Sequence, residues 1–471
     1  MRKHLALLLA AVLLFGSLAV AGCGKKPKQP SAETNAKTEQ TAGEDDAPAV
    51  RRLGTDLNIL TLNGSTLLEG GSTDSSIISE ALERRRRYVE ETYDVTLSLT
   101  TVADGNDYSA LSESYMAGLR AYDMVVPHPT KFLSTMMTSG MMQDLNSLPD
   151  IDTTKLWWNQ SQVENFTVSG KLFFGVSDFN LNGRGFSVNV MNRQMFNSYF
   201  LGEDIYRIVF DGDWTLERMA EYAVAVSDPD NGVYGYAFNA SGASGFFYGC
   251  GETLLKRNEQ GNFEMKWNVE KCSSIAEKVF ALVVGDQTFK DQWYNSNFPT
   301  SKAWTTFAGG KALILGMDIG AAGQLLADIS FETAFLPAPK LNEEQAQYHA
   351  MCGAGFVGIP NDAANPQDSG LILEALGWHS YYNFRPVYFD RYMSYRVSKS
   401  ADDYKVLELI LDQTVYDLGF TLDSVGLGAG LALGMLKTVV IDNVSTDVVS
   451  YIRQNETYCN DQFQTILKEI Y

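Results

Sequence analysis

The feature that most constrains the fold is a regular alternation of strand-forming and helix-forming segments. Three segments combine β-branched residues with alternating apolar positions: residues 56–62 (DLNILTL), 95–102 (VTLSLTTV) and 122–127 (YDMVVP). The two intervening segments, residues 74–92 and 108–119, carry apolar residues at helical spacing. Strands that alternate with helices in this way pair in parallel, so the pattern predicts an α/β fold.

Segments of the same two kinds continue through the rest of the chain. Further strands are predicted at residues 186–190, 234–238, 312–315 and 354–359, and another that ends at 335–339. Further helices are predicted at residues 367–376, at 402–415, within 442–471, and after a cap at Asp213 or Thr215. A chain of 471 residues is longer than one hydrophobic core usually supports, so two lobes are expected.

The N-terminal residues have the layout of a secretory signal. Basic residues precede an apolar run at residues 5–15, and the run is followed by Val20-Ala21-Gly22-Cys23. These four residues resemble a bacterial lipobox, in which the Cys thiol receives a diacylglyceryl lipid before cleavage. An uncleaved spanning helix and a plain signal ending near a Cys are the alternatives. We therefore expect a lipoprotein signal peptide at residues 1–22 and a lipid on Cys23.

The segment that follows the signal is expected to be a tether. Residues 23–52 contain Lys, Pro, Gln, Ser, Thr, Ala and Glu, with almost no large apolar residue. Such a segment cannot bury enough surface to offset the entropy lost on ordering, and it behaves as a flexible arm. The expected location is the cell membrane, with the chain lipid-anchored and facing the extracellular side or the periplasm.

Composition limits the partners of the folded part. The formal charge is −20, which opposes nucleic acid as a partner and suits a neutral or cationic solute better than a polyanion. Aromatic residues make up 12% of the chain, enough to leave rings for a binding cleft after the cores are filled. Four cysteines remain: Cys250, Cys272, Cys352 and Cys459. They have neither CxxC spacing nor a nearby His, so a metal site is not indicated. Four buried thiols are the favoured interpretation, and disulfide formation is the alternative.

Several short motifs are better explained by structure than by chemistry. Residues 353–358 match G-x-G-x-x-G, but the segment has strand character and leads into Pro360 instead of opening a helix. Residues 228–232 resemble part of a calcium loop but lack the Glu that closes such a loop, so a polar turn is favoured. In the run Arg84 to Arg87, three arginines lie four residues from a Glu, in the pairs Glu80–Arg84, Glu83–Arg87 and Arg86–Glu90, and the run indicates a solvated helix face. No cofactor or metal site is expected.

Seven stretches, in order, resemble sequence elements of one protein family. They are YDMVV from Tyr122, QDLNSL from Gln143, GKLFFGVS from Gly170, VNVMNRQMF from Val188, DWTLERMAEYA from Asp213, FAGGKALILGMDIG from Phe307 and FLPAPK from Phe335. Together they resemble the family 1 extracellular solute-binding proteins of bacterial ABC importers, the group that includes maltose-binding protein. The chain departs from the family pattern at Ser177, where a Pro is usual, and at Pro127-His128, where a sugar-gripping aromatic residue is usual.

The resemblance implies a two-lobed, type II periplasmic-binding-protein-like fold with a hinge between the lobes. The first α/β lobe would comprise residues 53–177 and about 356–388. The second would comprise residues about 178–355 and about 389–471. A ligand held between the lobes by closure would make the protein a monomeric binding protein with an ABC permease as its partner.

Candidate ligand-binding residues come from strand ends and from the resemblance. Ligands in open α/β sheets bind beyond the carboxyl ends of strands, which places Asn63 after the first strand and His128 after the third. By similarity to the family's ligand loops the other candidates are Thr130, Lys131, Asp178, Phe179, Phe247, Tyr248 and Asp318. A purely structural role is the alternative for each, such as a loop cap for Asn63 or Asp318 and a core ring for Phe247 or Tyr248.

The expected function is capture of a small solute, with a sugar or oligosaccharide as the favoured class, by a lipoprotein that delivers the solute to an ABC permease. No enzymatic activity is expected, because the chain has four His residues and none of the usual nucleophile or metalloprotease motifs. Two alternatives remain open: a two-lobed surface glycosidase that uses a carboxylate pair, and a ligand sensor for a signalling kinase.

Overall fold

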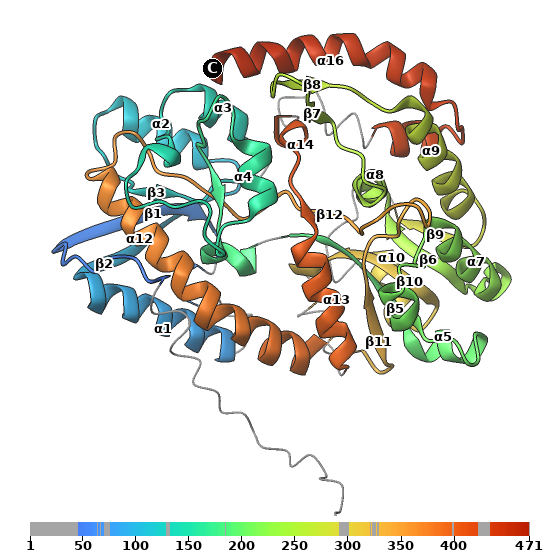
Figure 1. Cartoon of the computed structure of the whole chain (residues 1–471). Helices are drawn as coiled ribbons and strands as arrows, with labels where there is room; N and C mark the ends of the chain where they lie inside the picture. Colours follow the sequence, from blue (N-terminus) through green and yellow to red (C-terminus); the bar gives the residue numbers. More distant parts are fainter. Residues whose placement is uncertain are drawn as a thin grey trace, which may run out of the picture. The chain divides into compact units, whose positions relative to one another are not determined.

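A computed structural model of the chain contains two main β-sheets, each flanked by helices (Figure 1). The structure describes residues 46–63, 65, 67–69, 76–128, 132–183, 185–291, 301–320, 322, 326, 329–397, 400–422 and 434–470. The expected signal peptide, Cys23 and most of the expected tether lie outside the described residues. Residues 46–471 form one unit by their internal contacts, and the following description concerns that unit.

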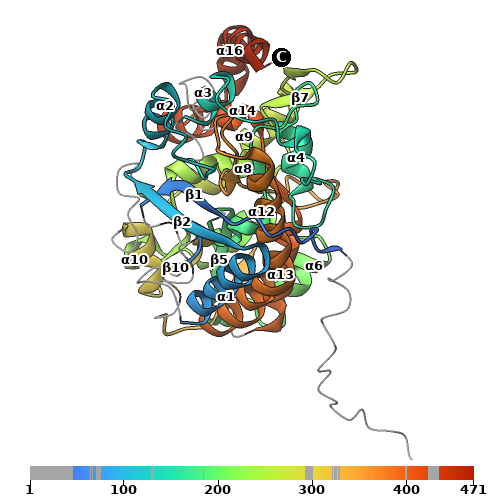
Figure 2. The same cartoon turned by 90° about the vertical axis from the view of Figure 1, so that its left-hand side faces the viewer.

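The first sheet has three parallel strands in the order β2-β1-β3. Strand β1 (Thr55–Leu62) pairs along its whole length with β2 (Val95–Val102), and its centre pairs with the short β3 (Met124–Val125). Helix α1 (Ser76–Tyr93) lies on one side of these strands and α2 (Asp107–Met116) on the other (Figure 2). The α/β alternation predicted from the sequence is confirmed. The second helix ends earlier than predicted, because Gly118 adopts a φ of 65° just after it.

The second sheet has five strands in the order β11-β5-β10-β6-β9 and is mixed in direction. Strand β5 (Ser187–Asn192) is antiparallel to both neighbours, β10 (Ala312–Asp318) and β11 (Thr333–Leu336). Strand β6 (Tyr234–Asn239) is parallel to β10 and to β9 (Thr288–Asp291). The carboxyl ends of β6, β10 and β11 therefore meet the start of β5 at one edge of the sheet.

Short strand pairs mark the places where the chain passes between the two sheets. Strand β4 (Gly175–Val176) is antiparallel to β13 (Phe356–Val357), and Gly358 bridges to Val125 of the first sheet. Strand β12 (Ala350–Met351) is parallel to β14 (Thr414–Val415). Residues 177–186 and 352–355 are thus the crossing segments. The strand predicted at residues 354–359 is shorter than expected, because only two of its residues pair with β4.

A long helical run forms a third connection. Helix α12 (Pro366–His379) continues through π-helical turns to Val397 and packs against α1. Helix α13 (Ala401–Asp412) then packs against β11 and α6 (Ile205–Phe210), at the second sheet. The helix predicted at residues 402–415 ends before β14, where the Thr414 hydroxyl donates to the Leu411 carbonyl. Tertiary pairing with β12 overrides the helical pattern there.

The C-terminal helix α16 (Val448–Ile470) packs against α9 (Val269–Val283), the hairpin strand β8 (Phe263–Met265) and α3 (Leu133–Thr138). Within the described residues, helices of sufficient length and apolarity to cross a bilayer are absent. Most of the apolar stretch at residues 426–436 lies outside the described residues. The remaining elements are α4 (Gln160–Phe166), α5 (Arg193–Tyr199), α7 (Leu216–Val226), α8 (Ser244–Gly249), α10 (Lys302–Ala308), α14 (Leu418–Leu422) and β7 (Leu255–Arg257).

The arginine cluster on α1 contains one residue that the sequence did not distinguish. The predicted ion pair between Glu83 and Arg87 is present, with an N–O distance of 2.9 Å. Arg85, by contrast, is fully buried and donates to the carbonyls of Leu67 and Phe179 and to the Ser380 hydroxyl. The prediction of a solvated face is therefore wrong for Arg85, which joins α1 to the first crossing segment and to the long helical run.

Candidate functional site

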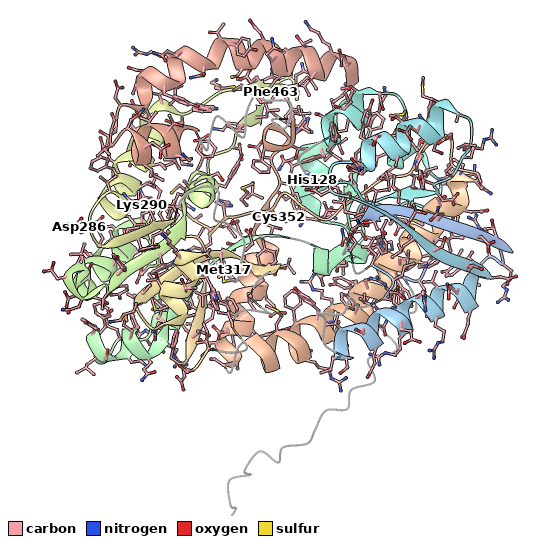
Figure 3. All side chains as sticks on the ribbon, turned by 180° about the vertical axis from the view of Figure 1, so that it is seen from behind. His128, Asp286, Lys290, Met317, Cys352 and Phe463 are labelled. Carbon is pink, nitrogen blue, oxygen red and sulfur yellow. The ribbon has the colours of Figure 1, made fainter. Side chains whose placement is uncertain are left out.

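A cavity of about 400 Å³ lies at the edge of the second sheet where the strand ends converge. Met317, at the end of β10, marks its position in Figure 3, with His128 of the first sheet and Cys352 of a crossing segment also labelled. The lining residues are Ser187, Val188, Asn189, Tyr236, Phe238, Gly242, Gly245, Phe246, Gly316, Met317, Asp318, Ala338 and Pro339. We call this space the sheet-edge cavity. Its position beyond the carboxyl ends of parallel strands is where α/β sheets bind ligands.

Three aromatic rings form one wall of the sheet-edge cavity. Tyr236 and Phe238, two residues apart on β6, point to the same face of the sheet and stack with ring centroids 4.9 Å apart. The Phe246 ring of α8 stands edge-on to both, at 6.0 Å from Tyr236 and 6.3 Å from Phe238. Gly316 makes this arrangement possible, since a Cβ at that position would lie 2.5 Å from the Tyr236 hydroxyl.

The lining also contains polar groups. Asn189 on β5 donates from its side-chain amide to the Pro337 carbonyl at 3.2 Å, which fixes the orientation of the amide. Asp318 is the last residue of β10 and lines the cavity; the residue is exposed, yet protein surrounds its carboxyl group. Desolvation by that surrounding protein raises the pKa of the Asp318 carboxyl above its ordinary value. The cavity thus combines aromatic faces with few polar groups, as small-molecule sites do.

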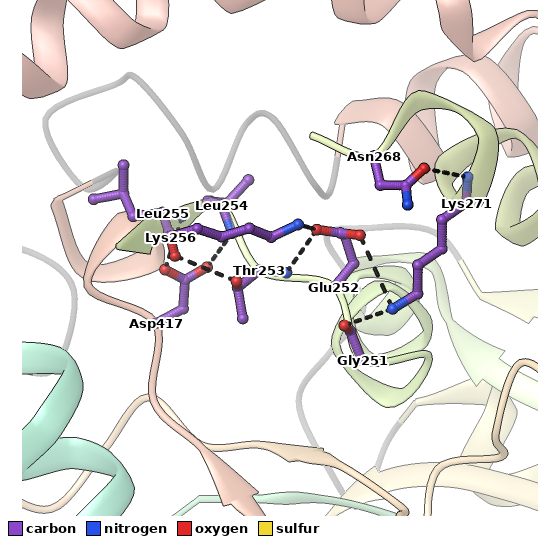
Figure 4. Close-up of polar contacts among 9 residues, drawn as sticks. All are labelled: Gly251, Glu252, Thr253, Leu254, Leu255, Lys256, Asn268, Lys271 and Asp417. Carbon is purple, nitrogen blue, oxygen red and sulfur yellow. Dashed lines mark hydrogen bonds and ion pairs between the residues drawn. The ribbon is translucent and has the colours of Figure 1, made fainter. Parts of the chain in front are cut away.

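A buried carboxylate holds the loop behind α8 in place (Figure 4). Asp417, just after β14, accepts hydrogen bonds from the backbone N–H groups of Leu254 (2.6 Å) and Gly419 (2.8 Å). Burial raises the pKa of the Asp417 carboxyl to about 6. In the same loop, the buried Glu252 pairs with Lys256. These contacts join the segment after β14 to the loop behind α8, the helix that carries Phe246.

A second cavity, of about 270 Å³, lies beside the first crossing segment. Asp178, with its side chain only 2% exposed, lies 3.7 Å from the Arg385 guanidinium, and Arg385 also reaches Asp412 at 3.5 Å. The Arg385 side chain packs between the rings of Tyr381 and Phe389. We call this space the crossing cavity. The predicted site residue Asp178 is thus a member of an ion-pair cluster that joins the crossing segment to the long helical run and α13.

The candidates at the first sheet lie in a different setting. Asn63 is exposed, and its backbone N–H donates to the Val102 carbonyl. The His128 imidazole lies 3.5 Å from the Asp104 carboxylate, and its backbone N–H donates to the buried Asp107. Thr130 and Lys131 lie outside the described residues. The described part of this strand edge therefore offers polar groups and one imidazole.

Three predicted aromatic candidates are core residues. Phe179 is fully buried with its ring against the Arg85 guanidinium, 5.2 Å from ring centroid to Cζ. Phe247 and Tyr248 are fully buried as well, and Phe247 packs against Trp267. Among the predicted residues only Asp318 lines the sheet-edge cavity, and Asp178 lines the crossing cavity. The ligand-binding roles of these residues remain predictions.

The aromatic wall was not identified from the sequence, although the sequence contained a signal for it. The segment YGYAFN, residues 234–239, places Tyr236 and Phe238 on one face of a strand whose carboxyl end opens into a loop. Phe246 directly precedes the predicted pair Phe247 and Tyr248. One helical position, about 100° around a helix of 3.6 residues per turn, separates the ring at the cavity from the rings in the core.

The fold is shared with many solved structures. An ABC substrate-binding protein from Listeria monocytogenes, solved with cycloalternan, is 14% identical, with a TM-score of 0.57 over 87% of this chain and 99% of its own. The galacto-N-biose-/lacto-N-biose I-binding protein of an ABC transporter from Bifidobacterium longum is 12% identical, with a TM-score of 0.59 over 87% and 97%. A cyclo/maltodextrin-binding protein, solved with maltotetraose, is 15% identical, with a TM-score of 0.56 over 88% and 96%.

No protein-family model and no curated protein sequence matches the chain. The solved structures nevertheless agree in architecture across most of its length. They confirm the predicted two-lobed, type II fold of the substrate-binding proteins, and with it the resemblance to maltose-binding protein at the level of the fold. By their printed names, these neighbours are binding proteins of transporters and bind sugars or oligosaccharides.

Proposed function

We propose that the protein captures a sugar or oligosaccharide and delivers it to an ABC transporter permease. The observation that supports this most directly is the aromatic wall of the sheet-edge cavity, formed by Tyr236, Phe238 and Phe246. Aromatic faces offer large contact area to the apolar faces of sugar rings, while neighbouring polar groups orient the hydroxyls. The cavity also lies at the strand ends of a fold that carbohydrate-binding neighbours share.

Capture would proceed by closure of the two lobes about the crossing segments. A ligand favours a closed form only when it makes contacts there that the open form lacks. In this chain the second lobe would supply the aromatic wall and Asp318, and the first would supply the strand-edge group that includes His128. Bending would be concentrated in residues 177–186 and 352–355, as hinge motions use a few terminal residues of elements.

We also propose that Cys23 carries a lipid and that the polar segment from residue 24 to the start of the folded unit at residue 46 tethers that unit to the membrane. The support is the stretch Val20-Ala21-Gly22-Cys23 and the polar composition that follows it. A tethered receptor would remain near its permease while its lobes open and close. Replacement of Cys23 by Ser is expected to abolish labelling by a radiolabelled fatty acid, and unchanged labelling would contradict the proposal.

The function proposed here is binding without catalysis. Glycoside hydrolysis commonly needs two carboxyl groups across the scissile bond, whereas Asp318 is the one carboxylate in the described lining of the sheet-edge cavity. A ligand sensor for a signalling kinase would use the same capture step, and loss of solute uptake on deletion of the chain would favour transport.

The test is a glycan panel with the full chain in detergent solution, read by thermal stabilisation and by product analysis. Capture predicts a rise in the unfolding temperature with at least one glycan and no new products. The variant Phe238→Ala should lose most of that rise. Phe263→Ala, a buried Phe on the β8 hairpin outside the cavity lining, should keep the rise relative to its own baseline. Turnover of a glycan would contradict the proposal.

A further inference from the structure

The described lining of the sheet-edge cavity contains a single charged residue. Among the described lining residues Asp318 is the only carboxylate, and none of them is a Lys, Arg or His. Lys340 directly follows the lining residue Pro339 in sequence. It is buried, and its ammonium nitrogen lies 5.6 Å from the centroid of the Tyr348 ring. The cavity therefore presents one negative charge to a ligand and offers no described positive charge in return.

The Asp318 carboxylate also lacks a described protein partner. No hydrogen bond or ion pair joins its oxygens to another residue of the described part of the chain. Desolvation raises the pKa of this carboxyl, and no neighbouring positive charge counteracts the rise. A cation placed beside Asp318 would supply the missing stabilisation of the charged form.

The aromatic wall also favours a ligand that carries a positive charge. The face of an aromatic ring carries negative electrostatic potential, and a cation near such a face is attracted to it. Here two stacked rings and one edge-on ring lie in the same cavity as the carboxylate. A neutral sugar would use the rings but not the charge, whereas an ammonium group attached to a sugar would use both.

We propose that the ligand is an amine-bearing sugar or oligosaccharide, whose ammonium group pairs with Asp318 while its ring packs on Tyr236 and Phe238. This inference rests on the proposed function and specifies its substrate class. Hydrogen bonds between charged groups are about twice as strong as those between neutral groups. An amine in place of a hydroxyl should therefore tighten binding by about tenfold or more.

The test uses three series of β-1,4-linked oligosaccharides that differ in one substituent. Glucose oligomers carry a hydroxyl at carbon 2, N-acetylglucosamine oligomers carry a neutral amide, and glucosamine oligomers carry an amine. Calorimetric titration of the full chain in detergent at pH 6 and low salt is expected to give the tightest binding for the amine series. Spermidine serves as a non-carbohydrate amine.

Two variants assign the preference to Asp318. Asp318→Asn should remove the amine preference, so that the amine series and the neutral oligomers bind this variant with similar affinities. Asp286→Asn removes an equal charge from an exposed turn remote from Met317 in Figure 3, and it should keep the preference. Thermal unfolding of both variants checks that each is folded.

The outcomes separate this inference from the function on which it rests. Neutral oligomers that bind as tightly as the amine series, or an unchanged preference in Asp318→Asn, would overturn the inference and leave sugar capture intact. Binding of spermidine without binding of any oligosaccharide would overturn both. Tightest binding of the amine series, lost in Asp318→Asn and kept in Asp286→Asn, supports the inference.

Discussion

The sheet-edge cavity and the crossing cavity each contain a carboxylate, but the two carboxylates differ in their partners. Asp178 in the crossing cavity is buried and faces the Arg385 guanidinium at 3.7 Å. Asp318 in the sheet-edge cavity is exposed and has no described partner. A buried charge without a partner is costly, so the first arrangement stabilises the fold. The second arrangement leaves a charge ready for a ligand.

The largest effect is expected when the paired carboxylate loses its partner. Arg385→Ala would leave Asp178 buried without its cation, and the free energy of unfolding should fall by about 3 kcal/mol. Arg385→Lys keeps a positive charge near Asp178 and should cost less. Chemical denaturation of both variants measures the difference. Equal losses for Ala and Lys would show that packing against Tyr381 and Phe389, and not charge, carries the contribution of Arg385.

A third carboxylate, Glu374 on α12, is intermediate between Asp178 and Asp318, because its hydrogen-bond partners are neutral groups and not a cation. It is 2% exposed and accepts hydrogen bonds from the Trp157 and Trp158 indoles, and burial raises its pKa to about 7 from the ordinary 4.5. Between pH 4.5 and 7 the folded state therefore keeps the proton on Glu374, whereas the unfolded state releases it. The contribution to stability is full below the unfolded pKa and is lost as pH rises towards 7.

The expected change is about 3 kcal/mol between pH 4.5 and 7 for the Glu374 group, with Asp417 adding a loss of the same sign as pH rises towards 6. Denaturation at several pH values compares the chain with Glu374→Gln, which cannot titrate. A smaller pH slope in the variant is the expected result. Identical slopes would show that Glu374 keeps its ordinary pKa in the folded state.

A smaller effect is expected at the aromatic wall. Gly316→Ala places a Cβ 2.5 Å from the Tyr236 hydroxyl and 3.4 Å from the Phe238 Cβ, so the rings must shift. Overpacking of this kind costs about 1–3 kcal/mol and should also weaken ligand binding. Gly320→Ala is the matched control, because its Cβ would meet no atom within 4 Å and Gly320 is not among the described lining residues of the cavity. Similar ligand affinities for the two variants would argue against a role of the wall in binding.

The smallest effect on stability is expected for Asp318. Because its carboxylate has no described partner and is exposed, Asp318→Asn should change the free energy of unfolding by less than about 0.5 kcal/mol. Denaturation of this variant beside Arg385→Ala measures the contrast between the two carboxylates directly. A loss comparable to that of Arg385→Ala would reveal a structural role for Asp318.

Much of the fold could be predicted because local pattern and tertiary structure agree. The first three strands and two helices were identified from alternation and helical spacing, and they form the first sheet as expected. The polar turn at residues 228–232 precedes β6 as expected, and the Thr215 hydroxyl caps α7. Failures occur where tertiary contacts override local pattern: Thr414 leaves a helical pattern to pair with β12, and Arg85 is buried among exposed neighbours.

Less of the candidate site could be predicted, for a geometric reason. A single sequence identifies the strand ends but not which side chain on a neighbouring helix points at them. Phe246 lines the cavity while Phe247 and Tyr248 fill the core, and all three have similar apolar character. Asp318 was identified through the family resemblance, which implies a ligand-binding turn after the strand predicted at residues 312–315. Its lack of a partner became visible only when residues distant in sequence were placed around it.

The four cysteines of the folded unit have a practical consequence. Cys250, Cys272, Cys352 and Cys459 are buried and no disulfide joins them in the described part of the chain, and burial raises the thiol pKa of Cys250 and Cys272 to about 12. Since the thiolate is the reactive species, these side chains should resist maleimide dyes at neutral pH. With Cys23 replaced by Ser, a dye pair on Glu113→Cys and Glu221→Cys, exposed on α2 and α7, would then report lobe motion by energy transfer.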